Sequence, residues 1–183
     1  MRIIGGTHKG KKLRPFPGKN IRPTSDRLRE AVFSILSDRI RGSRVLDLFA
    51  GTGALGIEAL SRGALEATFV DSEAAAIFLL NHNIQACGIT AKARIIQWNI
   101  LKNLTCIQSG TPEFTLVFMD PPYQKDMIRT TLHHLHNSRA LQKGAWIVIE
   151  HSTREPLKDL PAFQLKDARK YGKTLVSFLE YMV

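Results

Sequence analysis

Between residues 45 and 150 the chain alternates short apolar runs with stretches of helical periodicity, and this pattern constrains the fold more than any other feature. The apolar runs have the length of buried strands, whereas the stretches between them repeat apolar residues every three or four positions. Strands are predicted at 45–49, 67–71, 94–97, 116–120 and 145–150, and helices at 54–62, 73–86 and 126–136. Such alternation predicts an α/β fold, a parallel sheet with helices on both faces.

The two ends of the chain depart from this pattern. Gly and Pro residues in 1–24 predict a short strand or hairpin and then an irregular basic arm, after which Thr24 or Ser25 is expected to cap a helix ending near Ile40. Ser72 and Gly88 are expected to bound the helix at 73–86. Strand patterns at 163–169 and 175–182 flank Lys170-Tyr171-Gly172-Lys173, which indicates a hairpin. The length of 183 residues favours a single domain, with an arm at 1–24 and a core at 25–183.

Positive charge is concentrated at the front of the chain. Residues 1–44 hold twelve Lys or Arg and three Asp or Glu, whereas the other 139 residues hold fourteen and thirteen, within a formal net charge of +10. This asymmetry indicates a polyanionic partner, and we expect nucleic acid. A solubilising tail and a membrane surface are the alternatives, although no long basic amphipathic helix is visible in this region.

Composition also bears on the compartment of the protein. The chain begins without an apolar stretch typical of a secretory signal, and it has no run of eighteen apolar residues. Cys87 and Cys106 form no metal-binding pair, and the histidines at 133, 134 and 136 have no carboxylate or Cys at ligand spacing. We therefore expect a reduced cytoplasmic protein with no metal and no membrane span.

A glycine loop follows the first predicted strand. Residues 51–56 fit the pattern G-x-G-x-x-G at the start of a helix, and Asp71 lies twenty residues beyond Gly51, where a carboxylate can accept ribose hydroxyls. These features indicate a nucleoside cofactor, either NAD or S-adenosylmethionine. Asp47 favours S-adenosylmethionine, since a carboxylate attracts its ammonium and sulfonium but would repel a pyrophosphate. Alternatively, Asp47 only accepts a hydrogen bond from the loop backbone.

Asp120-Pro121-Pro122-Tyr123 follows the strand predicted at 116–120. The prolines fix the backbone, so the carboxylate of Asp120 and the carbonyl of Pro121 become two rigid acceptors for the N–H groups of an aromatic amine. The ring of Tyr123 offers a face on which a base can stack. This tetrapeptide favours attack by a base nitrogen on an electrophilic methyl group, held in line by positioning.

Together these segments resemble the RsmD family of class I N-methyltransferases of the Asn/Asp-Pro-Pro-Tyr type. The resemblance extends nearly end to end and is carried by residues 1–6, 22–24, 29–33, 45–64, 120–123, 150 and 170–172. It implies a Rossmann-like sheet of seven strands with an antiparallel last strand. It also implies S-adenosylmethionine-dependent methylation of N2 of a guanine in small-subunit (16S) ribosomal RNA, by a protein that we expect to be monomeric.

The resemblance also implies roles for individual residues. The expected catalytic residues are Asp120, Pro121, Pro122 and Tyr123. The expected cofactor contacts are Asp47, Phe49, Ala50, Gly51, Thr52, Gly53, Asp71, Ser72, Asn99 and Asp120. The expected RNA contacts are Arg2, Lys9, Lys11, Lys12, Arg14, Lys19, Arg22, Thr24 and Arg29. Asp71 stands where the family often has Glu, and Asn99 and Thr115 stand where it often has Asp; nothing in the sequence explains the change at Thr115.

Three other functions fit parts of the pattern. A DNA adenine-N6 methyltransferase can use the same tetrapeptide, but the chain is short for a separate target-recognition domain. An NAD-dependent oxidoreductase would explain the glycine loop and Asp71, but not the tetrapeptide or the basic arm. A non-catalytic RNA-binding module would not need Asp120 and Tyr123.

Overall fold

A computed structural model describes residues 1–16, 26–108, 111, 113–122, 127–155, 157 and 160–183. Its helices are α1 (Asp26–Ile35), α2 (Ser37–Ile40), α3 (Ala54–Ser61), α4 (Ala74–Cys87) and α5 (Met127–Ser138), with short 3-10 turns at Gly6–His8, Thr90–Lys92 and Thr105–Ile107. Its strands are β1 (Arg44–Leu48), β2 (Glu66–Asp71), β3 (Ala93–Gln97), β4 (Phe114–Met119), β5 (Leu141–Ser152), β6 (Phe163–Tyr171) and β7 (Thr174–Tyr181).

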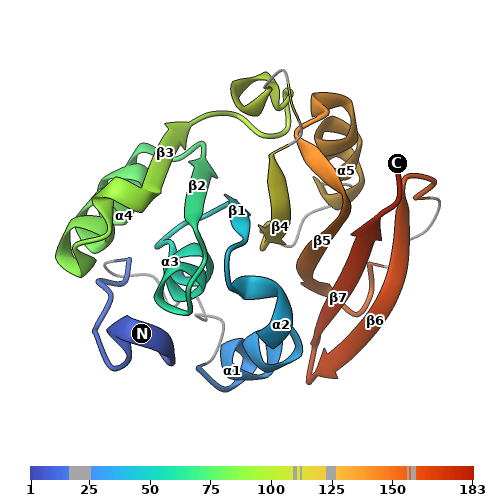
Figure 1. Cartoon of the computed structure of the whole chain (residues 1–183). Helices are drawn as coiled ribbons and strands as arrows, with labels where there is room; N and C mark the ends of the chain where they lie inside the picture. The colour runs from blue at the N-terminus through green and yellow to red at the C-terminus, as the bar shows by residue number, and fades with distance from the viewer. Residues whose placement is uncertain (17–25, 109–110, 112, 123–126, 156, 158–159) are drawn as a thin grey trace.

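The seven strands form one sheet in the order β3-β2-β1-β4-β5-β7-β6 (Figure 1). Strands β1 to β5 pair in parallel, whereas β7 is antiparallel to both of its neighbours, β5 and β6. This confirms the predicted α/β fold, the seven strands and the antiparallel last strand. The chain builds outward from β1 toward β3 and then returns to place β4 on the other side of β1. Ligands of such sheets bind beyond the carboxyl ends of the strands at this reversal of strand order.

Apolar residues on the two faces of the sheet enter two separate cores. On one face, Val45 and Phe118 pack with residues of α1, α3 and α4, including Phe33 and Ile57. On the other face, neighbouring strand residues such as Val117 pack against α5 and the turn at Thr105–Ile107. Helices therefore cover both faces, as predicted. The alternation of strand side chains decides which core each residue joins, and it directs Asp47 toward the face that α3 covers.

The first sixteen residues form a hairpin that docks on α3 and α4, beside the sheet (Figure 1). Arg2 and Lys12 form an antiparallel bridge, and the amide of Ile3 donates to the carbonyl of Lys11 at 2.9 Å. The buried carboxylate of Glu58 on α3 accepts from the amides of Ile4 and Gly5, both at 2.8 Å. Of the two predicted alternatives, a short strand or a hairpin, residues 1–16 form the hairpin, and helix side chains hold it against the domain.

Asn83 on α4 joins this hairpin to the glycine loop. Its side-chain oxygen accepts from the amide of Arg14 at 2.8 Å. Its side-chain nitrogen donates to the carbonyls of Arg14 at 3.2 Å and of Thr52 at 2.9 Å. Asn83 is only 1% exposed. One buried side-chain amide therefore satisfies backbone groups from two segments that are distant in the sequence.

Three local predictions need correction. The helix predicted to end near Ile40 divides at Leu36 into α1 and α2, and its expected caps, Thr24 and Ser25, lie outside the described residues. Ser72 does not cap α4; Glu73 occupies the N-cap position, and its amide donates to the carboxylate of Asp71. Strand β5 begins at Leu141 rather than 145, since Leu141 pairs with Phe114 before an irregularity in the register. The predicted C-terminal hairpin is confirmed, with Tyr171 paired to Thr174.

Candidate active site

A cleft opens at the carboxyl ends of β1, β2, β4 and β5. It brings together most of the predicted cofactor and catalytic residues: Asp47, Phe49, Ala50, Gly51, Thr52, Asp71, Ser72, Asn99, Asp120, Pro121 and Pro122. Gly53 lies below the cleft rather than on its wall, and Tyr123 lies outside the described residues. Four parallel strands of the predicted pattern therefore end at one place, where the glycine loop meets the residues that follow β4.

A side chain at Gly51 or Gly53 would disturb the backbone of the glycine loop. Gly51 and Gly53 have φ of 55° and 77°, in the left-handed region where glycine is favoured. A Cβ on Gly53 would lie 2.3 Å from Leu80 Cδ1, so the loop sits directly on α4. Phe49 also has a positive φ, 58°, which a non-glycine residue adopts only at a cost in backbone strain. Nothing in the sequence signals this conformation, which turns the chain at the exit of β1.

Asp71 organises this loop. One carboxylate oxygen accepts from the amide of Gly51 at 2.8 Å and the other accepts from the amide of Glu73 at 3.0 Å. Asp71 thus ties the glycine loop to the start of α4, a role that the sequence did not predict. Each carboxylate oxygen can accept a second hydrogen bond, so the position at the cleft wall still suits ribose hydroxyls.

Asp47 lies deep in the cleft and is only 2% exposed. Its Oδ2 accepts from the amide of Gly56 at 2.9 Å, which is the backbone role considered above. Burial raises the pKa of Asp47 to about 8, helped by the nearby carboxylates of Asp120 and Asp71 and opposed by the Gly56 hydrogen bond. A buried carboxyl with two carboxylate neighbours creates a place that favours a cationic group.

Asn99 and the residues after β4 complete the wall. The Oδ1 of Asn99 accepts from the amide of Leu101 at 3.1 Å, which shapes the turn after β3. Asp120 and Pro121 follow β4 and line the same cleft as the glycine loop, and the influence of Asp120 on the pKa of Asp47 reflects their proximity. The two predicted acceptors are therefore beside the loop expected to hold the cofactor.

Other residues of the cleft were not predicted as site residues. Phe16 from the hairpin lies over the glycine loop, with its ring 3.7 Å from the position of a Cβ on Gly51. Charged side chains from four separate segments also reach the wall: Arg27, Glu73, Glu150, Arg154 and Lys173. No local motif marks them, since only the sheet topology brings residues so far apart in the sequence to one edge.

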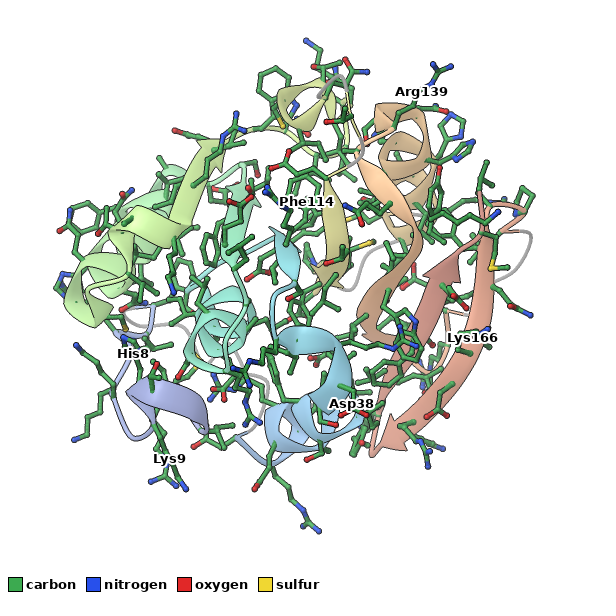
Figure 2. All side chains as sticks on the ribbon, viewed as in Figure 1. His8, Lys9, Asp38, Phe114, Arg139 and Lys166 are labelled. Carbon is green, nitrogen blue, oxygen red and sulfur yellow. The ribbon has the colours of Figure 1, made fainter. Side chains whose placement is uncertain are left out.

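The predicted RNA contacts divide into four groups, of which Arg29 alone forms the last. Lys9, Lys11, Lys12 and Arg14 are exposed on the hairpin, and Figure 2 shows Lys9 projecting from it. Arg2 is exposed but pairs with Asp26 at 3.3 Å. Lys19, Arg22 and Thr24 lie outside the described residues.

Arg29 does not fit the prediction. Its side chain is 0% exposed, and Nη2 donates to the carbonyl of Arg2 at 2.6 Å and to Asp26 at 2.9 Å. A guanidinium enclosed in this way has no surface for a phosphate, so Arg29 anchors the hairpin to α1 instead. Hydrogen bonds from a charged guanidinium are strong, so the contacts of Arg29 with Arg2 and Asp26 offset part of the cost of burying this side chain under α1.

This sheet order, the glycine loop after β1 and the carboxylates around it define a Rossmann-like methyltransferase fold. The chain belongs to the RsmD family, because the family model described as Conserved hypothetical protein 95 matches residues 1–180. Ribosomal RNA small subunit methyltransferase D of Escherichia coli K12 is 37% identical over 162 residues, which cover 88% of this chain and 80% of that protein.

Solved structures agree with the family assignment. The structure of the Escherichia coli protein yhhF has a TM-score of 0.88 and 33% identity, with 100% of this chain and 98% of that chain covered. A 16S rRNA N2 G1207 methyltransferase of Thermus thermophilus shares the fold at a TM-score of 0.70 and 24% identity, over 91% of this chain and 45% of that chain. Across the part of the chain that the structure describes, no helix is both long and apolar enough to span a bilayer.

Proposed function

We propose that this protein transfers a methyl group from S-adenosylmethionine to the exocyclic N2 amine of a guanine in small-subunit ribosomal RNA. The observation that carries this proposal is the position of Asp120 and Pro121 in the same cleft as the glycine loop and Asp47. The family relatives named as small-subunit rRNA methyltransferases support the substrate class. The Thermus thermophilus neighbour, which binds AdoMet and guanosine, supports the cofactor and the base.

The residues of the cleft suit S-adenosylmethionine better than a dinucleotide. The carboxylates of Asp71 and Asp120 beside the buried Asp47 attract an ammonium and a sulfonium and repel a pyrophosphate, and a bound cation favours release of the proton that burial keeps on Asp47. In this proposal Asp47 and the loop at 49–53 hold the methionine part, Asp71 and Ser72 lie at the ribose, and Asn99 contacts the adenine. When bound, the sulfonium supplies an electrophilic methyl group.

The protein's own contribution at the reacting nitrogen is to position it. The carboxylate of Asp120 and the carbonyl of Pro121 accept the two N–H groups of the guanine amine, which turns the nitrogen lone pair toward the methyl group. As the N–C bond forms, the bond from the methyl carbon to sulfur would break and leave a neutral thioether; the nitrogen gains a positive charge, which Asp120 stabilises before it accepts the proton that leaves. Pro122 fixes the backbone, and Tyr123 stacks on the base after it leaves its helix.

The test supplies purified protein and methyl-labelled cofactor with small ribosomal subunits, free rRNA or duplex DNA, and then identifies the labelled nucleoside after digestion. We expect N2-methylguanosine from RNA. Label only in DNA adenine would establish the alternative substrate, and no transfer to any nucleic acid would overturn the proposal. Cofactor binding measured by calorimetry, with NAD as a comparison, separates a methyltransferase from an oxidoreductase.

Asp120→Ala tests the assignment of the reacting site. We expect kcat to fall by about 100-fold or more, the usual range for loss of a group that handles the proton, while the Kd for the cofactor changes little. Asp38→Ala is the matched control, since Asp38 is an exposed carboxylate on α2. Equal activity of the two variants would exclude Asp120 from the reaction.

A further inference from the structure

A second basic surface lies on the side of the cleft formed by the end of β5 and the β6–β7 turn. Arg154 lies two residues after the end of β5, and Lys173 lies in the turn before β7. The amide of Thr153 donates to the carbonyl of Lys173 at 3.4 Å, so the two segments are held side by side. Both side chains are exposed, and both line the cleft that contains Asp120.

These two cations remain available to a ligand. Among the described residues, neither Arg154 nor Lys173 forms an ion pair, whereas Lys166 and Arg169 on β6 are paired with carboxylates. Glu150 also lines the cleft, but it is half-buried at the end of β5. The exposed outer part of this wall therefore carries positive charge, and the acidic groups lie deeper.

This surface and the hairpin approach the cleft from different sides. The hairpin docks on α3 and α4, whereas β6 and β7 form the opposite edge of the sheet (Figure 1). Residues from both regions, Phe16 on one side and Lys173 on the other, reach the same cleft. A nucleic acid strand that delivers one base to Asp120 continues in both directions from that base, and each continuation carries phosphates.

We propose that Arg154 and Lys173 form a second phosphate-binding surface, which holds the rRNA strand on the side of the target base opposite to the N-terminal hairpin. The inference rests on the proposed function and adds residues to it. Phosphate contacts fix the register of a nucleic acid without reading its sequence. The two cations would thus hold the flanking strand while the target base occupies the cleft.

The experiment compares Arg154→Ala/Lys173→Ala with a control that removes the same charge. Lys92→Ala/Lys143→Ala serves this purpose, since both lysines are exposed near the amino-terminal ends of β3 and β5, whereas the cleft lies at the carboxyl ends of the parallel strands. RNA affinity is measured as a function of salt. Each lost phosphate contact lowers the log–log slope by about 0.7 to 0.9, so we expect the first variant to lose about 1.4 to 1.8 and the control to change little.

Two further measurements separate the possible results. Cofactor Kd and melting temperature should be the same in both double variants, and the exchange Arg154→Lys/Lys173→Arg should keep the wild-type slope because the charge remains. Equal slopes for the cleft variant and its control would overturn the inference. If wild-type protein methylates RNA in that case, the proposed function stands and only the second surface is rejected; if wild-type protein methylates no RNA, the proposed function itself fails.

Discussion

Replacing Asp47 by Asn should stabilise the protein without its cofactor, and the gain should depend on pH. The pKa of this carboxyl is raised from 3.8 to about 8 in the folded protein, chiefly by burial. Between these values the unfolded chain releases a proton that the folded protein keeps, so the free energy of unfolding falls as pH rises through this window. Asn at this position retains an oxygen that can accept from the amide of Gly56 but carries no titratable proton.

The magnitude follows from the width of the window. Each pH unit between 3.8 and 8 lowers the free energy of unfolding of the wild type by about 1.4 kcal/mol, so the difference between pH 4 and pH 7 is about 4 kcal/mol at most. Asp47→Asn removes this loss. The expected gain in stability over the wild type is therefore small near pH 4, about 4 kcal/mol at pH 7, and constant above pH 8.

Urea denaturation at four pH values between 4 and 8.5 measures this difference directly. Asp38→Asn is the control, since it removes an exposed carboxylate. A difference between Asp47→Asn and the wild type that stays constant across the pH range would refute the reasoning about burial. The same substitution should weaken binding of S-adenosylmethionine by about 10- to 100-fold, because a hydrogen bond to a charged ammonium contributes about 1.5 to 3 kcal/mol.

Two further substitutions test the packing around the site. Gly56→Ala would place a Cβ 2.3 Å from Phe69 Cε1, so we expect a loss of about 1 to 3 kcal/mol, visible as a lower urea midpoint; an unchanged midpoint would show that Phe69 can move at no cost. Glu58→Gln leaves Arg62 without its buried partner and presents an amide nitrogen to the hairpin, so we expect a loss of about 3 to 5 kcal/mol. Faster amide hydrogen exchange at Ile4 and Gly5 should accompany it, and exchange as slow as in the wild type would contradict this role of Glu58.

Local patterns predicted the central fold well, because buried parallel strands and their covering helices have distinct apolar periods. The glycine loop and the residues after β4 were found for the same reason, since each follows a strand whose end the pattern fixes. The surroundings of single residues were less predictable. Arg29 was expected to contact RNA, yet its long side chain is buried and reaches the carbonyl of Arg2.

The unpredicted parts of the site depend on contacts between distant segments. Asp71 was assigned to a ligand, but the sequence could not show that its oxygens also hold the amides of Gly51 and Glu73. Arg154 and Lys173 reach the cleft only because β7 pairs antiparallel with β5, with Ser152 opposite Thr174. No spacing within the sequence encodes that register.

The buried amide of Asn83 joins the two regions of the molecule that we propose to bind ligands. One side chain hydrogen-bonds both the backbone of Arg14 in the hairpin and the carbonyl of Thr52 in the glycine loop. A substitution at residue 83 should therefore disturb both the hairpin that we propose to contact RNA and the loop that we propose to hold the cofactor.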